Sequence, residues 1–79
     1  MEKEKKRLLK KLGKHIRKIR EEKGMSQTEL ANIINKDQPS IQRLEAGNIN
    51  PSFYYLHEVA MGLEVDLDML IKKLPSKKG

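Results

Sequence analysis

The chain has no cysteine and no tryptophan, and it has few aromatic and apolar residues. Only 37% of its 79 residues are hydrophobic, and its aromatic residues are one Phe and two Tyr. Without cysteine there is neither a disulfide framework nor a cysteine-based metal site. No apolar run approaches the ~18 residues of a membrane span, and the charged N-terminus does not resemble a signal peptide. We therefore expect one small cytoplasmic domain with a modest core and no membrane partner.

Signals of catalysis are missing as well. The two histidines, His15 and His57, are isolated, and neither a Ser/His/Asp order nor a glycine-rich phosphate loop is present. The carboxylates of Glu21, Glu22 and Glu29 fit solvated helix faces better than a catalytic pair. We expect no enzyme activity, no metal and no cofactor, and no small-molecule ligand is evident.

Positive charge is abundant but unevenly placed. The net charge is +6, and residues 1–20 carry ten Lys or Arg against two Glu. Residues 21–71 carry three Lys or Arg against nine Asp or Glu, and residues 72–79 add four Lys. A uniformly basic face would favour non-specific coating of nucleic acid. This distribution instead favours contact with DNA through a defined edge.

The segment 26–47 predicts two short helices, at about 27–34 and 38–46, joined by a tight turn. Asn35 accepts the left-handed backbone conformation that such a turn needs. Asp37 is a good N-cap for the second helix, although its charge would repel a phosphate if it were not occupied as the cap. Two short helices with such a turn describe a helix-turn-helix.

The first of these helices opens with a capping box, in which Ser26 accepts from the N–H of Glu29 and the Glu29 carboxylate accepts from the N–H of Ser26. Apolar residues at helical spacing form the inner faces of both helices. They are Leu30, Ala31, Ile34, Ile41 and Leu44. The second helix turns polar groups outward.

At this point the sequence resembles the lambda-repressor-like (Cro-type) DNA-binding domains. Gln27, Ala31 and Asn35 match the first helix and the turn, and the run 44–52 (Leu-Glu-Ala-Gly-Asn-Ile-Asn-Pro-Ser) looks like the family's Ile-Glu-x-Gly-x-x-x-Pro-Ser. The resemblance covers roughly residues 12–71. It implies a compact, all-α, five-helix domain that acts as a sequence-specific, double-stranded DNA-binding transcriptional regulator.

The domain itself is expected at 8–71, between a charged, flexible lead-in (1–7) and a basic, flexible tail (72–79). A helix is predicted from about Lys5 to Lys23, with Gly13 costing roughly 1 kcal/mol relative to Ala. Its apolar stripe is Leu9, Leu12, Ile16 and Ile19.

A fourth helix should begin after Asn50 as its cap, with Pro51 in its first turn. A fifth, short helix is expected after Asp66. The stripes predicted to reach the core are Phe53, Leu56, Ala60 and Leu63 in the fourth helix, and Leu67, Leu70 and Ile71 in the fifth.

The second helix of the pair is the predicted recognition helix, because the major groove admits an α-helix and shows a distinct pattern for each base pair. Amide side chains read adenine, and Arg reads guanine in bidentate fashion. The predicted base-reading residues are Gln38, Ser40, Gln42 and Arg43. Pro39 disfavours helical geometry at Gln38.

The resemblance also implies a set of phosphate contacts, made by helix N-termini and flanking polar groups. They are Arg20, Gln27, Thr28, Lys36, Asn48 and Asn50. By the same match Arg20 pairs with Glu45, and a half-buried carboxylate beside Leu44 needs such a partner.

One recognition helix makes few contacts, so we expect a homodimer on an inverted repeat, with half-sites about one helical turn apart. The face with Tyr54, His57 and Met61, or the last helix with Met69, is the expected interface. Two alternatives stay open. One is a specialised regulator, such as an antitoxin or a restriction–modification controller. The other is a protein-interaction adaptor that keeps the fold without specific DNA binding.

Overall fold

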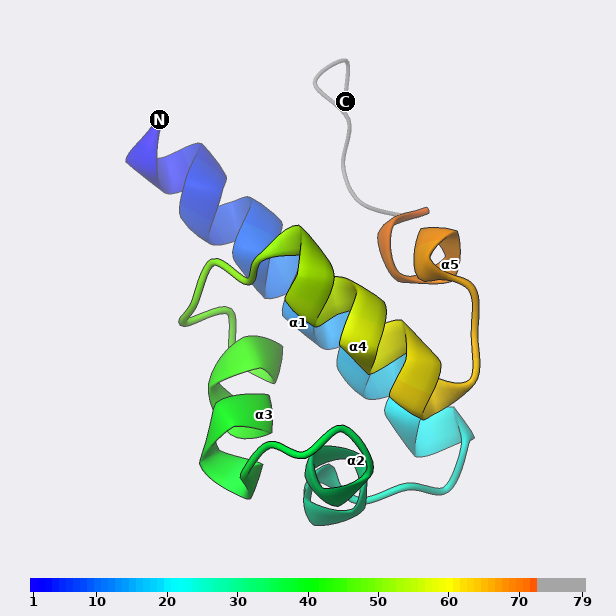
Figure 1. The fold of residues 1–79 in the computed structure, drawn as a ribbon. Helices are drawn as coiled ribbons and strands as arrows, with labels where there is room; N and C mark the ends of the chain where they lie inside the picture. The colour runs from blue at the N-terminus through cyan, green and yellow to red at the C-terminus, as the bar shows by residue number, and fades with distance from the viewer. Residues whose placement is uncertain (73–79) are drawn as a thin grey trace.

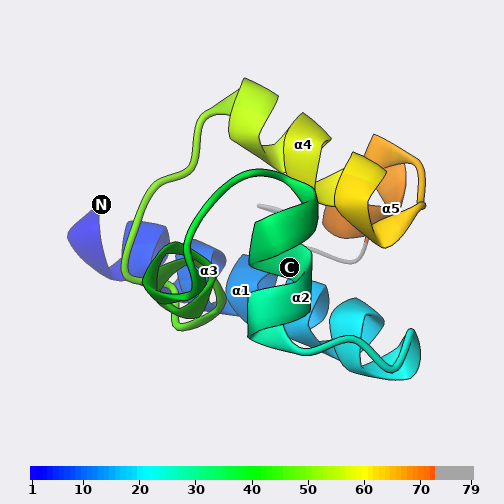
Figure 2. The ribbon, with the colours of Figure 1, turned by 60° about the horizontal axis from the view of Figure 1, so that its bottom comes forward.

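The computed structural model describes residues 1–72, and within that range it contains five helices and no strand. The helices are α1 (Glu2–Glu22), α2 (Gln27–Ile33), α3 (Gln38–Glu45), α4 (Phe53–Leu63) and α5 (Leu67–Ile71). Figure 1 shows the long α1 behind α4, with α2 and α3 below them and α5 beside α4. Figure 2 shows α4 and α1 on opposite sides of the molecule. The predicted all-α, five-helix class is confirmed.

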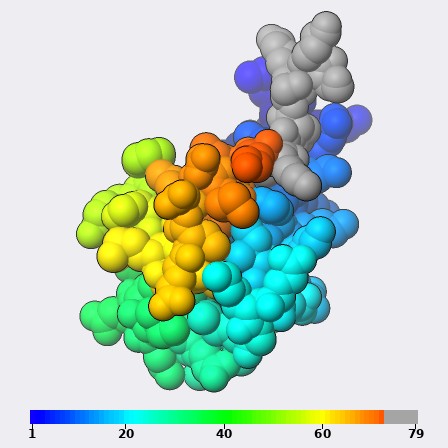
Figure 3. All heavy atoms as spheres, turned by 90° about the vertical axis from the view of Figure 1, so that its right-hand side faces the viewer, coloured from blue at the N-terminus to red at the C-terminus, as the bar shows by residue number. Residues whose placement is uncertain are grey.

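A single apolar core joins these helices. Its members are buried side chains from every helix or its cap: Leu12, Ile16, Ile19, Leu30, Ala31, Ile34, Ile41, Leu44, Val59, Ala60, Leu63 and Leu70. Figure 3 shows α5, in orange, seated against both α4, in yellow, and α1, in blue. None of the helices in this described range has the length and apolarity to cross a membrane.

The first helix differs from its predicted bounds mainly at its start. It begins at Glu2, three residues before the expected Lys5, and ends at Glu22 with Lys23 as C-cap. Residues 2–7, expected as a lead-in, are helical in the structure. Of the tail expected at 72–79, all but the first residue lies outside the described residues.

Gly13 has a packing role that the sequence analysis did not assign to it. It is buried in the middle of α1, and a Cβ built on it would lie 2.3 Å from the carbonyl oxygen of Glu45 and 2.6 Å from that of Leu44. Only a residue without a side chain lets α1 and the end of α3 approach so closely. The conformational cost of Gly13 is therefore offset by the contact that it permits.

The turn between α2 and α3 follows the prediction closely. The capping box of Ser26 and Glu29 is present at the start of α2. Asn35 is left-handed, with φ of 59°, and the N–H of Lys36 donates to the carbonyl oxygen of Ala31 at 2.8 Å. This bond satisfies a carbonyl that the end of α2 would leave without a partner. The turn thus fixes the direction in which α3 leaves α2.

The predicted start of α4 is wrong. Its N-cap is Ser52, whose Oγ accepts from the N–H of Tyr55 at 2.9 Å, and the helix begins at Phe53. Asn50 and Pro51 both precede the cap. Ser52 has the extended backbone of an N-cap, and its hydroxyl accepts from a backbone N–H three residues later, the hydrogen bond that defines such a cap.

The apolar stripe of α4 is shifted relative to the prediction. Val59 is fully buried although the sequence analysis left it out, and Phe53 is 72% exposed although it was placed in the core. Leu56, Val59, Ala60 and Leu63 form an i, i+3, i+4, i+7 stripe. Phe53 stands in the first turn, beyond the margin of this stripe.

In α5 Leu70 is fully buried, whereas Leu67 is half-buried and Ile71 is 42% exposed. The core contribution predicted for Ile71 is therefore wrong. Leu67 and Leu70, three residues apart, both pack on the core, whereas Ile71 is turned more toward solvent.

Candidate nucleic-acid interface

A buried ion pair fixes α3 against α1. Arg20 of α1 donates from Nε to Glu45 Oε2 at 2.6 Å and from Nη2 to Glu45 Oε1 at 2.9 Å. Its Nη1 donates to the carbonyl oxygen of Met25 at 2.7 Å. Both side chains are buried. The hydrogen-bonded Glu45 carboxylate raises the pKa of Arg20 above its usual value. The structure thus joins the two residues that the sequence analysis paired, in a bidentate arrangement.

Two glutamines extend this pair across the helix-turn-helix. Gln27, the first residue of α2, donates from Nε2 to Glu45 Oε1 at 2.9 Å. Gln38, the first residue of α3, donates from Nε2 to Gln27 Oε1 at 2.8 Å. The chain Arg20–Glu45–Gln27–Gln38 therefore links the end of α1, both ends of α3 and the start of α2. Such a network holds the two helices in one relative position.

Gln27 and Gln38 were both predicted at the interface, but the bond between them was not predicted. The signal was present: both are amides at the first position of their helices. A primary amide carries two N–H donors and a carbonyl acceptor. After donating to Gln27, Gln38 keeps one N–H and its carbonyl oxygen unused by this bond. The bond to Gln27 also fixes the orientation of the Gln38 amide, and with it the direction of the second N–H and the carbonyl oxygen.

The cap of α3 uses Asp37 and Ser40. Asp37 Oδ1 accepts from the backbone N–H of Ser40 at 2.9 Å and from its Oγ at 2.6 Å. The bond from the Ser40 hydroxyl holds the pKa of the Asp37 carboxyl below its usual value. The carboxylate is therefore occupied as a cap. Because the Ser40 hydroxyl donates its proton to Asp37, its oxygen can only accept a further hydrogen bond, from a base or from Arg43. Arg43 Nη2 lies 3.5 Å from the Ser40 Oγ.

Gln42 and Arg43 stand on the outer face of α3, and both are exposed. They are consecutive residues on the helix, with Gln38 one turn before Gln42. This face carries two amides and a guanidinium, the groups suited to adenine and guanine edges.

The predicted phosphate-contacting residues fall into two groups. Thr28, Asn48 and Asn50 are exposed on α2 and on the loop after α3. Lys36 is exposed but turns toward α4, where its Nζ lies 3.4 Å from Glu58 Oε1 and 5.4 Å from the centre of the Tyr55 ring. Arg20 and Gln27 belong to the buried network described above.

The histidines are engaged in packing contacts. His15 donates from Nε2 to the carbonyl oxygen of Met69 at 2.6 Å, which ties α1 to α5. The rings of His57 and Tyr54 lie 5.8 Å apart on the outer face of α4. Within residues 1–72 there is no group of three or more His, Cys, Asp or Glu side chains that could hold a metal ion.

A groove separates α3 from α4, with a volume of about 420 Å³. Lys36, Arg43 and Tyr55 are among the residues that line it. The hydroxyl of Tyr55 is buried without a hydrogen-bond partner among the described residues. Burial raises the pKa of this phenol, and the nearby Glu58 raises it further. The half-buried ring of Tyr55, with its phenol proton retained, forms part of the wall of this groove.

Comparison with known proteins identifies this arrangement. A model of the family described as Helix-turn-helix matches residues 16–70. No curated protein sequence matches the chain. Several solved structures do, and three of them illustrate the range.

One is the restriction–modification controller protein C.AhdI from Aeromonas hydrophila, at 31% identity and a TM-score of 0.77, with 78% of this chain and 90% of that chain covered. Another is the clp gene regulator ClgR from C. glutamicum, at 30% identity and a TM-score of 0.76, with 82% and 85% covered. The third is the restriction–modification controller protein C.Esp1396I, solved as a tetramer in complex with its natural 35 base-pair operator. It is 40% identical, with a TM-score of 0.74 and 82% and 91% covered. The chain belongs to the lambda-repressor-like helix-turn-helix family of DNA-binding transcription regulators.

Proposed function

We propose that this regulator inserts α3 into the major groove of its operator and reads bases with Gln38, Ser40, Gln42 and Arg43. The observation that carries the proposal is the hydrogen-bonded chain from Arg20 to Gln38, because it fixes α3 on α1 and α2 while Gln42 and Arg43 stay exposed. A reading helix that is held rigidly loses little entropy when it binds. Each good bidentate pair with a base contributes about 1–3 kcal/mol of discrimination.

Phosphate contacts would hold the register of α3 on the duplex. We assign them to Arg20, Gln27, Thr28, Lys36, Asn48 and Asn50. The side chains of Thr28, Asn48 and Asn50 are exposed, so they can turn onto a phosphate without disturbing the packing of the fold. Arg20 and Gln27 would contribute with the N–H donors that the buried network leaves over.

The proposed assembly is a homodimer on an inverted repeat in the cytoplasm, where the DNA is. Tyr54 and Met61 are 67% and 63% exposed on the outer face of α4, and His57 lies between them in sequence. Met69 of α5 is 40% exposed. Apolar residues grouped in this way favour burial against a partner, and the tetramer of C.Esp1396I on its operator supports a second copy as that partner. Half-sites would lie about 34–36 Å apart.

A more specific role, the control of a restriction–modification system, is favoured by one observation. Two controllers of this kind, C.AhdI and C.Esp1396I, match most of the chain at 31% and 40% identity. ClgR matches nearly as well at 30%. A restriction enzyme and a methyltransferase encoded beside the gene would support the controller role, and their absence would leave a general regulator.

The deciding experiment is selection of bound sequences from a random duplex library at ~150 mM salt, where non-specific phosphate binding is weakened. The wild-type chain is compared with a Gln42→Ala/Arg43→Ala variant. A Lys11→Ala/Lys18→Ala variant is the matched control, because it also removes two long exposed side chains but leaves α3 intact.

We expect a palindromic motif for the wild type and for the control, and a lost or relaxed motif for the α3 variant. If no sequence is enriched and binding vanishes with modest salt, the regulator proposal fails and the adaptor alternative takes its place. Light scattering over a concentration series, with and without the selected operator, tests the dimer. A monomer throughout would refute that part.

A further inference from the structure

One edge of α1 carries a row of basic residues. Positions 3, 6, 10, 13, 17 and 20 follow one another at spacings of three and four, so they lie along one side of the helix. All are Lys or Arg except Gly13. We call Lys3, Lys6, Lys10 and Arg17 the basic edge.

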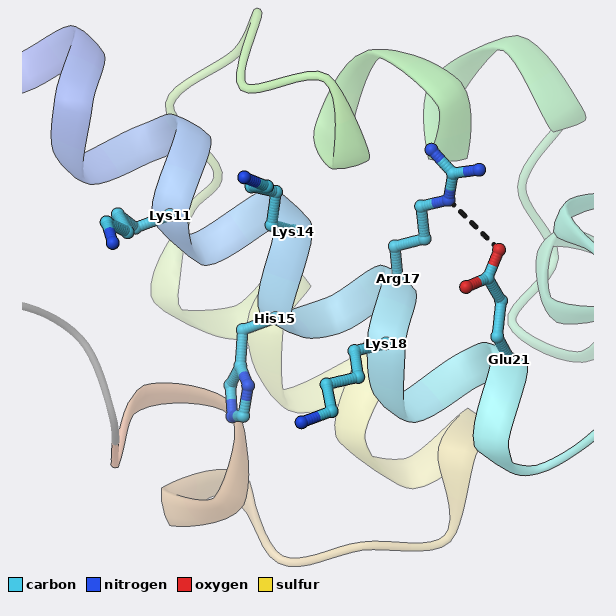
Figure 4. Close-up of a pocket in the computed structure, with 6 residues that line it drawn as sticks. All are labelled: Lys11, Lys14, His15, Arg17, Lys18 and Glu21. Atoms are coloured by element: carbon cyan, nitrogen blue, oxygen red, sulfur yellow. Dashed lines mark hydrogen bonds and ion pairs between the residues drawn. The ribbon is translucent and has the colours of Figure 1, made fainter.

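This edge adjoins α3 and the loop that follows it. Gly13 lies against the carbonyl oxygen of Glu45, as described above, and Arg20 pairs with the same residue. One turn earlier, a Cβ on Gly47 would lie 2.7 Å from Lys10 Cα. Figure 4 shows Arg17 directed toward α3, whereas Lys18 points toward α5. The basic edge therefore continues the interface from the loop that holds Asn48 and Asn50.

The charges of this edge are largely unused by the fold. The ion pairs among residues 1–72 are Arg17–Glu21, Arg20–Glu45 and Lys36–Glu58. Lys3, Lys6 and Lys10 take part in none of them, and all three are exposed. Several unpaired cations in a row next to a DNA-binding surface suit a polyanion.

Lys3, Lys6 and Lys10 of this edge also lie outside the part that the family model matches, which starts at residue 16 and includes Arg17. Helix α1 extends 14 residues upstream of that point. At ~1.5 Å per residue, Lys3 and Lys10 are separated along the helix by roughly 10 Å. That length corresponds to about three base pairs of B-DNA, at 3.4 Å each.

We propose that the basic edge binds phosphates of the operator duplex beside the segment that α3 reads. The inference rests on the proposed function, which supplies the duplex. Figures 1 and 2 place α1 on the side opposite α4. With the exposed face of α4 turned to a second copy, α1 lies on the outer side of each subunit. The phosphates contacted are those flanking the half-site away from the dimer centre.

The test compares two double variants with equal loss of charge. Lys6→Gln/Lys10→Gln neutralises the basic edge, and Lys11→Gln/Lys18→Gln neutralises two exposed lysines of the same helix that lie off that edge. Glutamine and lysine have similar helix propensities, and circular dichroism melts verify that both variants fold as the wild type does. Dissociation constants are measured against salt concentration on the selected operator with long flanks, on the same operator trimmed to its half-sites, and on a non-specific duplex.

Each phosphate contact contributes about 0.9 to the slope of log K against log salt. We expect the edge variant to lose about 2 units of slope per subunit on the long operator, and the control to lose none. On the trimmed operator the edge variant and the wild type should bind alike. Both variants should select the wild-type motif, since phosphate contacts carry no base information.

Equal slopes for the two double variants on the long operator would overturn the proposal, and the basic edge would then be a solvated face. An equal defect of the edge variant on long and trimmed operators would overturn the flanking position. Failure of the proposed function looks different: the wild type would then prefer no sequence, although the edge variant could still show a reduced slope on the non-specific duplex.

Discussion

Substitution of Gly13 by alanine separates helix propensity from tertiary packing, because the two act in opposite directions. In an isolated helix the change should stabilise by about 1 kcal/mol. In this structure the added Cβ lies 2.3 Å from the Glu45 carbonyl oxygen and 2.6 Å from the Leu44 carbonyl oxygen. Ordinary contacts begin near 3.4 Å, so α1 and the end of α3 must separate by about 1 Å.

Both sets of clashing atoms belong to backbone, so no side chain can rotate away to relieve them. We place the cost at about 2–3 kcal/mol, the upper part of the range for overpacking. After the gain in propensity, a net loss of about 1–2 kcal/mol remains. For a domain of this size each kcal/mol lowers Tm by about 4–8 °C. The separation also pulls Glu45 from Arg20, so affinity for the operator should fall.

The assay is thermal and urea unfolding followed by circular dichroism at 222 nm, the usual helix band. Gly62→Ala is the matched control, since Gly62 also lies inside a helix. Its added Cβ would meet Ile34 Cγ2 at 2.6 Å and Leu30 Cδ1 at 2.9 Å, which are side-chain atoms whose rotation can relieve part of the overlap, unlike the backbone atoms beside Gly13. We expect Gly62→Ala to be the less destabilising of the two. A Gly13→Ala variant with a raised Tm would refute the reasoning.

Three further predictions follow. Arg20→Ala and Glu45→Ala should each lower the free energy of unfolding by about 3–5 kcal/mol, because each leaves a buried charge without its partner. In a double-mutant cycle measured by urea unfolding, the double variant should lose much less than the sum of the two single losses. Additive losses would contradict a coupled pair. Ser52→Ala should lower the free energy of unfolding by about 1 kcal/mol through the loss of the α4 cap, whereas Asn50→Ala should leave it nearly unchanged. Equal losses for the two variants would contradict the assignment of the cap to Ser52. Because the pKa of Asp37 is lowered in the folded state, its contribution to the free energy of unfolding is complete above the ordinary value of 3.8 and is lost as the pH falls through the lower folded value. Asp37→Asn should therefore make the free energy of unfolding less dependent on pH in acid. An unchanged dependence would contradict this.

Local sequence signals determined much of the interface. The capping box at Ser26, the left-handed residue at Asn35 and the cap at Asp37 each depend on residues within a few positions, and each is present as predicted. The pairing of Arg20 with Glu45 joins positions 25 residues apart, and it was inferred from a family resemblance and from the cost of a half-buried carboxylate. Short-range chemistry and one long-range match were enough to outline the helix-turn-helix.

Where periodicity alone was used, it predicted the stripe of α1 largely correctly, with Leu12, Ile16 and Ile19 buried, but it misplaced one end of the stripe of α4. Phe53 and Val59 both fit an apolar stripe of α4, and only the position of the neighbouring helices decides which of them reaches the core. The start of α4 was also misplaced, because Asn50 was predicted as its cap and the structure has Ser52 there. A helical wheel shows which residues share a side, but it does not show where the core ends.

The sequence by itself predicted five helices and the turn of the helix-turn-helix, because caps, turns and apolar spacing act over a few residues and need no knowledge of the fold. That these helices form a DNA-binding domain was implied by the family resemblance. Only the tertiary structure decided how close the helices come. It shows Gly13 as the contact between α1 and α3, joins Gln27 to Gln38, and places the basic edge beside the loop after α3. These features depend on distances between segments far apart in the chain, and such distances are set by the packing of the whole core.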